Sequence, residues 1–576
     1  MKLEKYKKNI LAIILSLILV IFIWHKFLVS GNTVVFLLVL MAMYYFIKKV
    51  LDNENKPKCI TTVTISIIFA IIEIVCTSIN TDFTLNHIID KWLVINFLGY
   101  VILSWSIIST IYTFFDNNQL MKKKINKSIL VEPKKMFFIN ILLILIAWLP
   151  YFLRYFPGLL TADSCAQVAQ AIGIAPLTNH HPVFHTGLIA IFLNIGINLF
   201  GNINLGVAMY TIFQMIAMAT MFSIVLYYLS KKEIPLFIRI VILLFYMIYP
   251  INALFSVTMW KDVLFAGIIP IFVILQIELI FNTESFLMKK KNIAIYIIVS
   301  LLVFFMRNNG IYVAVLSMPF IAIVLRKYWK KIIPMFLGII VIYCVLKTAI
   351  FSLLNIQNGS VAEMLSVPLQ QIARVEKNHR EELNDETINQ INNFFECKNI
   401  GDKYNPVLSD PVKAELNTNF FNENKLEFIN LWLKLLRNYF KDYVESFISN
   451  SYGYYYPEAT HWVANRTMET NSMGIEQKPL IEGKIVSKID SLIEQRNLPL
   501  ISMCFSIGTA FWMIVICLGY KIYTKEYKNI LIYIPIFILW LTIVASPVFC
   551  EYRYAYSLFT VLPIYISLNF KNRKEK

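Results

Sequence analysis

Apolar residues occur along this chain in uninterrupted runs of helical length, and short polar segments between the runs carry most of the charge. An α-helix needs about 20 consecutive apolar residues to cross a bilayer, whereas the strands of a membrane β-barrel alternate in polarity over about ten residues. The runs here are long and uniformly apolar. They predict an all-α polytopic membrane protein, in which each span satisfies its own backbone hydrogen bonds.

This criterion predicts about 14 spans. In chain order they are 9–29, 33–47, 60–79, 92–115, 136–153, 205–229, 234–252, 263–282, 292–306, 311–325, 332–353, 499–520, 529–547 and 554–570. The segment 183–200 is also apolar enough to compete with them.

Lys and Arg residues decide the expected orientation, because short loops rich in them stay on the cytoplasmic side. The basic clusters are at 2–8, 48–58, 122–135, 231–232, 289–291, 326–331, 521–528 and 571–576. They all fall on one side only if 183–200 does not cross the membrane. We therefore expect 183–200 to be a re-entrant or interfacial helix, and we expect both termini of this multi-pass cell-membrane protein to be cytoplasmic.

Composition agrees with lipid as the main solvent. Of 576 residues, 58% are hydrophobic and 15% are charged, which is too little polar surface for a soluble globule of this size. The net charge of +17 is explained by the cytoplasmic loops and does not require a nucleic-acid partner. The eight cysteines show neither metal-ligand spacing nor a disulfide framework.

Four regions are predicted. Residues 1–130 form an N-terminal four-helix membrane module, and 131–353 form a membrane core whose first outer loop is 154–204. Residues 354–498 form a large, mainly helical extracytoplasmic domain, and 499–576 hold the last transmembrane helices and a basic cytoplasmic tail. With this orientation the polar segments at the edges of the spans gather on the outer side.

The first outer loop predicts a helix of about three turns between Thr161, as N-cap, and Gly173. Its polar face carries residues spaced at i, i+4 and i+7, namely Asp163, Gln167 and Gln170. A carboxylate in the first turn also complements the helix dipole. Spacing alone therefore favours a functional and a purely structural role for Asp163 about equally.

Basic residues at the outer ends of other spans favour the functional role. Lys261, Arg307 and Arg553 each lie at such an end, and Asp262 follows Lys261 directly. Ionisable groups at membrane depth are costly and are functional candidates, although a single Arg often extends its side chain to the interface. A carboxylate that accepts a proton beside cations that hold a phosphate suits transfer of a group from a lipid phosphate.

Three histidines raise the possibility of a metal. His181 and His185 are four residues apart and can share a helical face, with Pro182 in the first turn. Two histidines without a third ligand are a weak indication of zinc. Hydrogen bonding within the loop, or neutralisation of a phosphate by these residues and His180, remains the alternative; a divalent metal stays open and no other cofactor is predicted.

The outer domain contains the aromatic segment SYGYYYPEATHW at 451–462. Tyrosine rings can stack on sugars, but aromatic residues near a membrane are more often interfacial anchors. We interpret residues 454–456 as anchors, and Glu458 and His461 as candidate contacts for an acceptor.

A short helix that carries Asp163 in the first outer loop of the core, with a large outer domain toward the C-terminal end, resembles the GT-C superfamily of membrane glycosyltransferases, relatives of the protein O-mannosyltransferases. The motifs TADS, HHPVFHT, WKD, RNNG, SVPLQQIAR and EYRY together are similar to an uncharacterised bacterial family of multi-span membrane proteins that is usually grouped with those enzymes. The resemblance covers roughly 136–570. One departure is that Asp163 is followed by Ser164, where many members carry a second acidic residue.

The resemblance implies a transferase that moves a hexose or pentose from a polyprenyl-phosphate carrier to a cell-envelope polymer or glycolipid on the outer side. Asp163 would be the general base, and the three outer cations would hold the lipid phosphate. Residues expected to contact the substrate are Gln167, His181, His185, Asp262, Asn308 and Tyr552.

Two other classes compete with this interpretation. A transporter or flippase of lipid-linked sugars or small molecules would place its polar residues near the bilayer midplane and often shows internal repeats, and neither feature is evident. A surface binding or scaffold protein would explain the outer domain but not the cations at the ends of the spans.

The basic clusters generate a prediction about topology. Cysteine labelling from outside the cell should modify a probe placed at Asn399, in the outer domain, and should miss one placed at Asn126, in a basic loop. Labelling of Asn126 but not of Asn399 would reverse the orientation and remove the argument for an outer site.

Overall fold

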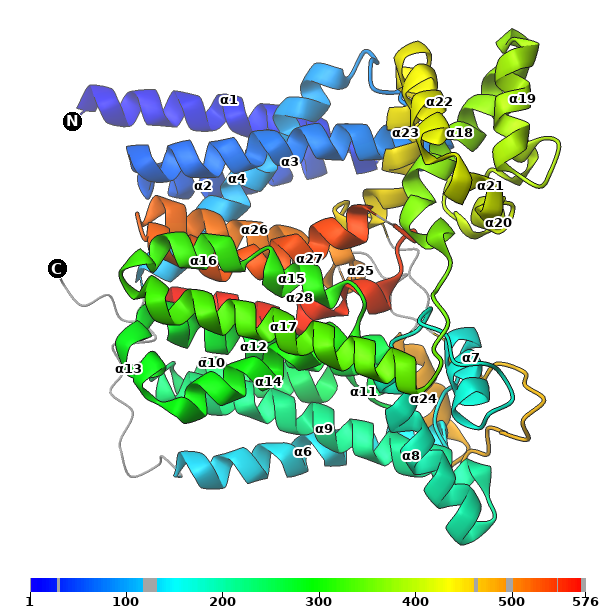
Figure 1. The fold of residues 1–576 in the computed structure, drawn as a ribbon. Helices are drawn as coiled ribbons and strands as arrows, with labels where there is room; N and C mark the ends of the chain where they lie inside the picture. Colours follow the sequence, from blue (N-terminus) through cyan, green and yellow to red (C-terminus); the bar gives the residue numbers. More distant parts are fainter. Residues whose placement is uncertain are drawn as a thin grey trace. The chain divides into compact units, whose positions relative to one another are not determined.

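The computed structural model describes residues 2–27, 32–117, 132–459, 465–493, 501–545 and 547–570. Within these ranges the regular elements are all helices, and β-pairing is limited to isolated bridges, so the predicted all-α class is confirmed (Figure 1). Asn126 and His461 lie outside the described residues.

The chain forms two compact units. Unit 1 contains Met1–Lys123, Ser366–Tyr456 and Phe511–Ile530, and unit 2 contains Lys124–Leu365, Pro457–Ala510 and Leu531–Lys576. The units do not coincide with the four predicted regions, because the N-terminal module and most of the predicted outer domain belong to the same unit.

Nine helices among the described residues are long and apolar enough to cross a membrane, which supports a multi-pass membrane protein. These are Tyr6–Lys26 in α1 (Lys2–Phe27), α2 (Thr33–Asp52), α3 (Lys56–Asp82), α4 (Leu93–Asn117), α6 (Pro133–Arg154), α8 (Val183–Phe200), α9 (Ile203–Lys231), α12 (Lys261–Phe281) and Arg326–Leu353, which includes α17 (Trp329–Leu353).

Other predicted spans are bent, broken or short. The segment 234–252 divides into α10 (Leu236–Ile248) and α11 (Pro250–Ser256), which are bent by 52°, where Pro250 cannot continue the first helix. The segment 311–325 divides into α15 (Gly310–Val315) and α16 (Met318–Val324). The helices α14 (Lys290–Met306), α26 (Ile507–Tyr523), α27 (Ile534–Ala545) and α28 (Tyr552–Ser567) have fewer than 18 residues. The count of 14 therefore stays a prediction.

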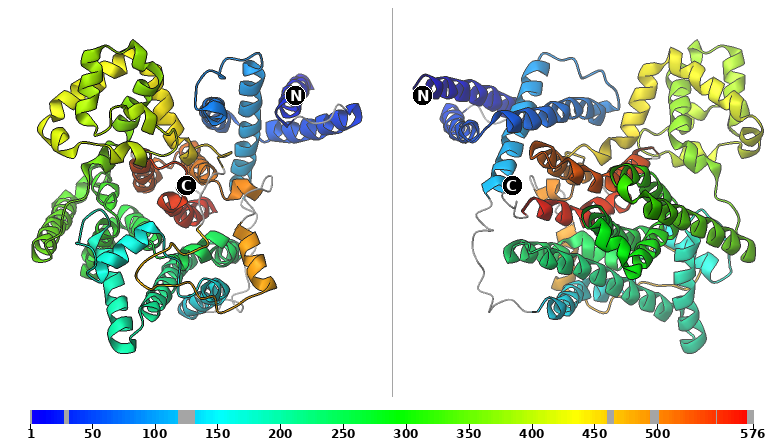
Figure 2. Two further views of the ribbon diagram at one scale, coloured as in Figure 1. Left: turned by 90° about the vertical axis from the view of Figure 1, so that its right-hand side faces the viewer. Right: turned by 60° about the vertical axis from the view of Figure 1, so that its left-hand side comes forward.

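The helix α8 has the length and composition of a span, although we expected it not to cross. In the left view of Figure 2, α6 is seen end-on and α8 is seen from the side, so α8 is steeply inclined to α6. Gly196 of α8 and Gly206 of α9 lie so close that a Cβ on Gly196 would be 2.4 Å from the Gly206 nitrogen. The inclination fits an interfacial helix, and whether α8 crosses stays a prediction.

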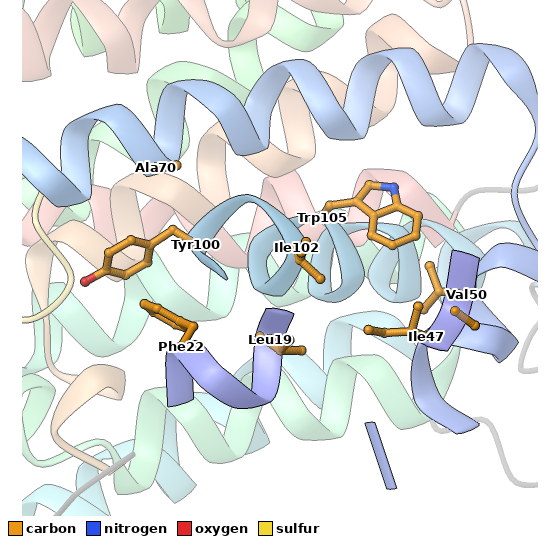
Figure 3. Close-up of a cluster of buried hydrophobic side chains, with 9 residues drawn as sticks. Leu19, Phe22, Ile47, Val50, Ala70, Tyr100, Ile102 and Trp105 are labelled. Carbon is orange, nitrogen blue, oxygen red and sulfur yellow. The ribbon is translucent and has the colours of Figure 1, made fainter. Parts of the chain in front are cut away.

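In unit 1, α1 to α4 pack through a cluster of buried apolar residues (Figure 3). Phe22 of α1 contacts Tyr100 of α4 with ring centroids 4.8 Å apart. Gly99 makes this contact possible, because a Cβ there would lie 2.2 Å from Cγ of Phe22. The N-terminal helices thus form a packed body.

The remainder of unit 1 is a set of shorter helices around a buried ionic cluster. They are α18 (Ser366–His379), α19 (Asp385–Phe394), α20 (Asp410–Ala414), α21 (Thr418–Glu423), α22 (Lys425–Asn438) and α23 (Phe440–Ser451). Arg374 forms a salt bridge with Glu445 and lies 3.5 Å from Asp442, and it donates hydrogen bonds to the Tyr404 hydroxyl and the Phe83 carbonyl. The Phe83 contact ties these helices to the end of α3.

The interpretation of residues 454–456 as membrane anchors is wrong for Tyr454 and Tyr456. Both side chains are buried, and the Tyr456 hydroxyl lies 3.2 Å from that of Thr77 in α3. The segment packs against α3 within unit 1, which explains its aromatic content without a lipid interface.

In unit 2, α12 is the central helix. In the most apolar stretch of 18 residues, 83% of α12 is buried inside the protein, compared with 22% of α6. It packs against α9, α14 and α28. Residues at the first turn of α12 are therefore surrounded by other elements of the unit.

The ionic cluster of unit 1 generates a prediction about stability. Arg374→Ala leaves the buried carboxylates of Glu445 and Asp442 without their guanidinium group, and we expect it to lower the free energy of unfolding by about 3–5 kcal/mol. Lys441→Ala is the control, because this lysine is 3.8 Å from Glu445 but its side chain is 58% exposed, so we expect a loss of at most about 1 kcal/mol. Urea unfolding of the purified protein measures both, and equal losses would contradict a structural role for Arg374.

Candidate active site

Two segments that are distant in the sequence pair through their backbones just before α7 (Ala162–Ala171) and α12. The Leu159 amide donates to the Val257 carbonyl over 2.8 Å, and the Met259 amide donates to the Leu159 carbonyl over 2.9 Å. Gly158 has φ +146°, and a Cβ there would lie 2.2 Å from the Thr211 hydroxyl oxygen, so the tight approach requires glycine. The pairing brings the first turns of α7 and α12 together.

Side chains reinforce this junction. The Trp260 indole donates to the Thr161 hydroxyl over 2.7 Å, and the Ser164 hydroxyl donates to the Met259 carbonyl over 2.6 Å. Thr161 occupies the N-cap position of α7, as the sequence predicted, but its side chain makes no capping hydrogen bond and its hydroxyl oxygen accepts the bond from Trp260. Both bonds hold α7 against the start of α12.

Asp163 lies at the centre of an ionic cluster formed from three helices. Its Oδ2 is 2.6 Å from Nη1 of Arg553, in α28, and 3.4 Å from Nζ of Lys261, in α12. The Asp163 side chain is 28% exposed and each cation is 13% exposed. Residues predicted to act as base and phosphate ligands are therefore adjacent and reachable from solvent.

Further charges extend the cluster. Nε of Arg307, which follows α14, is 3.3 Å from Oδ1 of Asp262, and Nε of Arg553 is 3.4 Å from Oε1 of Glu551. The Tyr554 ring lies beside both guanidinium groups, at 4.6 Å from that of Arg307 and 4.9 Å from that of Arg553. Arg307 and Asp262 are 9% and 1% exposed, so this pair is less available to a ligand than Lys261 and Arg553.

The protonation states follow from these contacts. Burial opposes ionisation of Asp163, but the charges of Lys261 and Arg553 hold its pKa well below the ordinary range of an aspartate. Burial and the nearby Lys261 lower the pKa of His181 to about 3, so its neutral ring accepts a hydrogen bond from Lys261 at Nδ1, over 2.9 Å. Burial raises the pKa of Glu551, Arg553 opposes the rise, and the negative charge of Asp262 adds to it.

Gln167 and His185, predicted to bind substrate, instead belong to a buried chain of hydrogen bonds. His185 lies 3.1 Å from the Gln167 amide through Nδ1 and 2.6 Å from the Tyr210 hydroxyl through Nε2. Tyr210 donates to Oε1 of Gln214, whose amide nitrogen lies within 3.1 Å of the carbonyls of residues 255, 256 and 258. The chain supports the segment that pairs with Leu159, and both predicted residues are at most 1% exposed.

The direction of these bonds fixes a tautomer. Gln214 must turn its oxygen to Tyr210, since its nitrogen donates to carbonyls, so Tyr210 donates to Gln214 and accepts from Nε2–H of His185. A neutral His185 then accepts at Nδ1, which requires the Gln167 amide to turn its nitrogen toward the ring. After this turn the Gln167 oxygen accepts from the Thr186 hydroxyl, to which the Gln167 nitrogen otherwise donates over 2.9 Å.

The other two predicted substrate residues lie in different surroundings. Tyr552 is fully buried, and its hydroxyl is 2.6 Å from that of Tyr249. Asn308 is exposed and donates to the Asn179 carbonyl over 3.1 Å, which places it beside the histidine loop. Of this pair, only Asn308 is open to a ligand.

A divalent metal does not fit the cluster. The carboxylates of Asp163, Asp262 and Glu551 are each compensated by a basic side chain, which would repel a cation. Within the described ranges, no group of three or more His, Cys, Asp or Glu side chains is arranged to hold a metal ion. No step of the chemistry is therefore assigned to a metal.

Residues 173–576 match a family of unknown function (DUF6020), which is more than half of the chain. The chain belongs to this family. No curated protein and no solved structure matches it. The region matched to DUF6020 includes His181, Lys261, Arg307 and Arg553, and it begins ten residues after Asp163.

Tyr554 and Trp260 belong to the site of this DUF6020 protein, although sequence reasoning did not select them. Arg553 lies 5.1 Å from the Trp260 ring as well as near Tyr554. The spacing of the EYRY motif carried a signal for Tyr554, because residues three apart on a helix lie on one face, and Glu551 and Tyr554 have this spacing.

The buried chain generates a prediction that separates support from substrate binding. Tyr210→Phe leaves Nε2–H of His185 and Oε1 of Gln214 unpaired, and we expect it to lower the free energy of unfolding by about 1–3 kcal/mol. Tyr312→Phe, at a 49% exposed tyrosine of the same unit, should change it by less than about 0.5 kcal/mol. Urea unfolding measures both variants, and an unchanged Tyr210→Phe protein would contradict the supporting role.

Proposed function

We propose that this protein is a membrane glycosyltransferase that moves a sugar from a polyprenyl-phosphate carrier to an acceptor hydroxyl of a cell-envelope polymer or glycolipid. The observation that supports it is the contact of Asp163 with both Lys261 and Arg553. A carboxylate and two cations, partly exposed at one point, supply the groups that such a transfer needs. The likeness to GT-C enzymes rests on the sequence motifs.

On the donor side, the cations would hold the phosphate. A guanidinium group binds two phosphate oxygens in a fork, and an ammonium group adds a compact charge. Arg553 and Lys261 approach the same carboxylate oxygen, so an anion at that point would contact both. As the sugar–phosphate bond breaks, its electron pair passes to the phosphate oxygen, and these charges stabilise the product.

On the acceptor side, Asp163 would accept the proton. The acceptor oxygen forms a bond to the anomeric carbon of the sugar, and its proton passes to the Asp163 carboxylate. Lys261 and Arg553 lower the pKa of Asp163 in the ligand-free site, which makes it a weak base there. A bound phosphate would draw the same cations away and restore basicity to Asp163 when the donor is in place.

The proposed location follows the sequence. The multi-pass character is supported by the long apolar helices. We propose that the site faces the outer side of the cell membrane and that both termini face the cytoplasm, as the basic loops indicate. Membrane lipid then surrounds the spans, and the carrier lipid reaches the site from the outer leaflet.

Asp163→Asn tests the proposal. The substitution preserves size and a hydrogen-bond acceptor for Arg553 but removes the base, so single-turnover transfer should fall by about 10²- to 10⁴-fold while donor binding remains. Release of free polyprenyl phosphate from a labelled donor measures transfer, and a lipid or sugar transporter would release none.

The control separates chemistry from the helix dipole. Asp385→Asn removes another first-turn carboxylate, in α19, and should lower stability slightly, by about 0.3–1 kcal/mol, with transfer intact. Thermal unfolding of both variants is followed beside the assay. Near-normal transfer by Asp163→Asn would remove Asp163 as the base.

A further inference from the structure

The ionic cluster of unit 2 is balanced in charge without a ligand. It contains three basic side chains, Lys261, Arg307 and Arg553, and three acidic side chains, Asp163, Asp262 and Glu551. His181 is neutral. With all six groups ionised, the sum of charges is zero.

An additional anion would disturb this balance. The six side chains are between 1% and 28% exposed, so water screens them incompletely. Uncompensated charge in such surroundings is costly, and buried groups commonly change protonation instead. A phosphate that carries one negative charge therefore requires a proton or the departure of one of the carboxylates.

Glu551 is the carboxylate best placed to take that proton. The proposed function requires Asp163 to stay ionised as the base, and Asp262 is 1% exposed beside Arg307, whereas Glu551 is 17% exposed and has one cation at 3.4 Å. Among the described residues, Nε of Arg553 makes no hydrogen bond, so this pairing is loose. Solvent can deliver a proton to Glu551 more easily than to Asp262.

The surroundings of Glu551 also favour its protonation. The charged or titratable groups that interact with Glu551 are Cys550, Arg553 and Tyr554 from its own segment and α28, Asp262 from α12 and Asp163 from α7. Lys261 and Arg307 complete the surroundings as the partners of these two aspartates. Burial raises the pKa of Glu551, and both acidic neighbours add to this rise. A phosphate bound to Arg553 would weaken its one stabilising partner.

We propose that the cluster binds a phosphodiester anion together with one proton, and that Glu551 takes up this proton. The inference rests on the proposed function in placing a phosphate at Lys261 and Arg553 and in keeping Asp163 ionised. It adds a requirement that transfer chemistry does not need, namely that affinity for the donor depends on pH through a residue other than the base.

Thermodynamic linkage gives the direction in which affinity changes with pH. Protonated Glu551 favours the bound state, and binding in turn raises its pKa further. Between its pKa in the free protein, which already lies above the ordinary value, and its higher pKa in the complex, each unit of rising pH should weaken binding by up to about tenfold.

The experiment uses the full-length protein in detergent and dibutyl phosphate, a diester that carries one negative charge throughout the range. Its dissociation constant is measured calorimetrically from pH 5 to 8, in buffers of different ionisation enthalpy, which reports the protons taken up. We expect uptake of about one proton by the wild type. Glu551→Gln, whose amide imitates the protonated acid, should bind with a pH-independent constant and no uptake.

A control variant and the possible outcomes separate this inference from the proposed phosphate site. Glu476→Gln removes an exposed carboxylate that pairs with Lys478, and it should retain the pH dependence. A flat wild-type profile, or uptake that persists in Glu551→Gln, would overturn the inference and leave the phosphate site standing. Absence of diester binding at any pH would overturn both the inference and the phosphate part of the proposed function. If Glu551→Gln does not fold, the wild-type proton count still decides whether the diester binds together with a proton, and a count of zero overturns the inference.

Discussion

Backbone pairing between residues 158–160 and 257–259 is the constraint on which the candidate site depends. Leu159 exchanges hydrogen bonds with the segment around Thr258, so α7 and α12 begin side by side. Asp163 and Lys261, 98 residues apart in the chain, meet for this reason. The buried chain from His185 through Tyr210 to Gln214 ends on carbonyls of the same segment, so the polar interior of unit 2 supports the junction that positions the charges.

The two ionic clusters of the protein differ in a way that bears on function. In unit 1, Arg374 and Glu445 are 5% and 4% exposed, and the guanidinium group is also bonded to Tyr404 and to a backbone carbonyl. Such a deeply buried pair, with further bonds to other elements, is typical of an interaction that holds helices in place. In unit 2, Asp163 is 28% exposed and two cations point to one of its oxygens. Partial exposure and convergent charge are properties of a site that exchanges internal partners for a ligand.

Charge balance connects the chemistry of the site with its stability. A neutral cluster persists without a ligand, because each charge has a partner, but for the same reason a phosphate must compete with Asp163 for Lys261 and Arg553. Tyr554 lies beside both arginines, and its ring attracts each guanidinium group. Under the proposed function, binding of an anion would therefore be coupled to the state of these carboxylates, as suits a base that works only beside a bound donor.

The sequence by itself determined the all-α class, the membrane character and the positions of the chemically important charges. In lipid, long and uniformly apolar runs satisfy their backbone hydrogen bonds as helices. Ionisable residues at the ends of such helices are costly and are therefore functional candidates. Hydropathy could not show where Pro250 bends a helix or that Tyr454 packs inside the protein, because it reports polarity and not partners. Only the tertiary structure brought α7, α12 and α28 together and separated Gln167, His185 and Tyr552, which are enclosed by protein, from Asp163, Lys261 and Arg553. That distinction depends on contacts between residues up to 390 positions apart, which no local pattern contains.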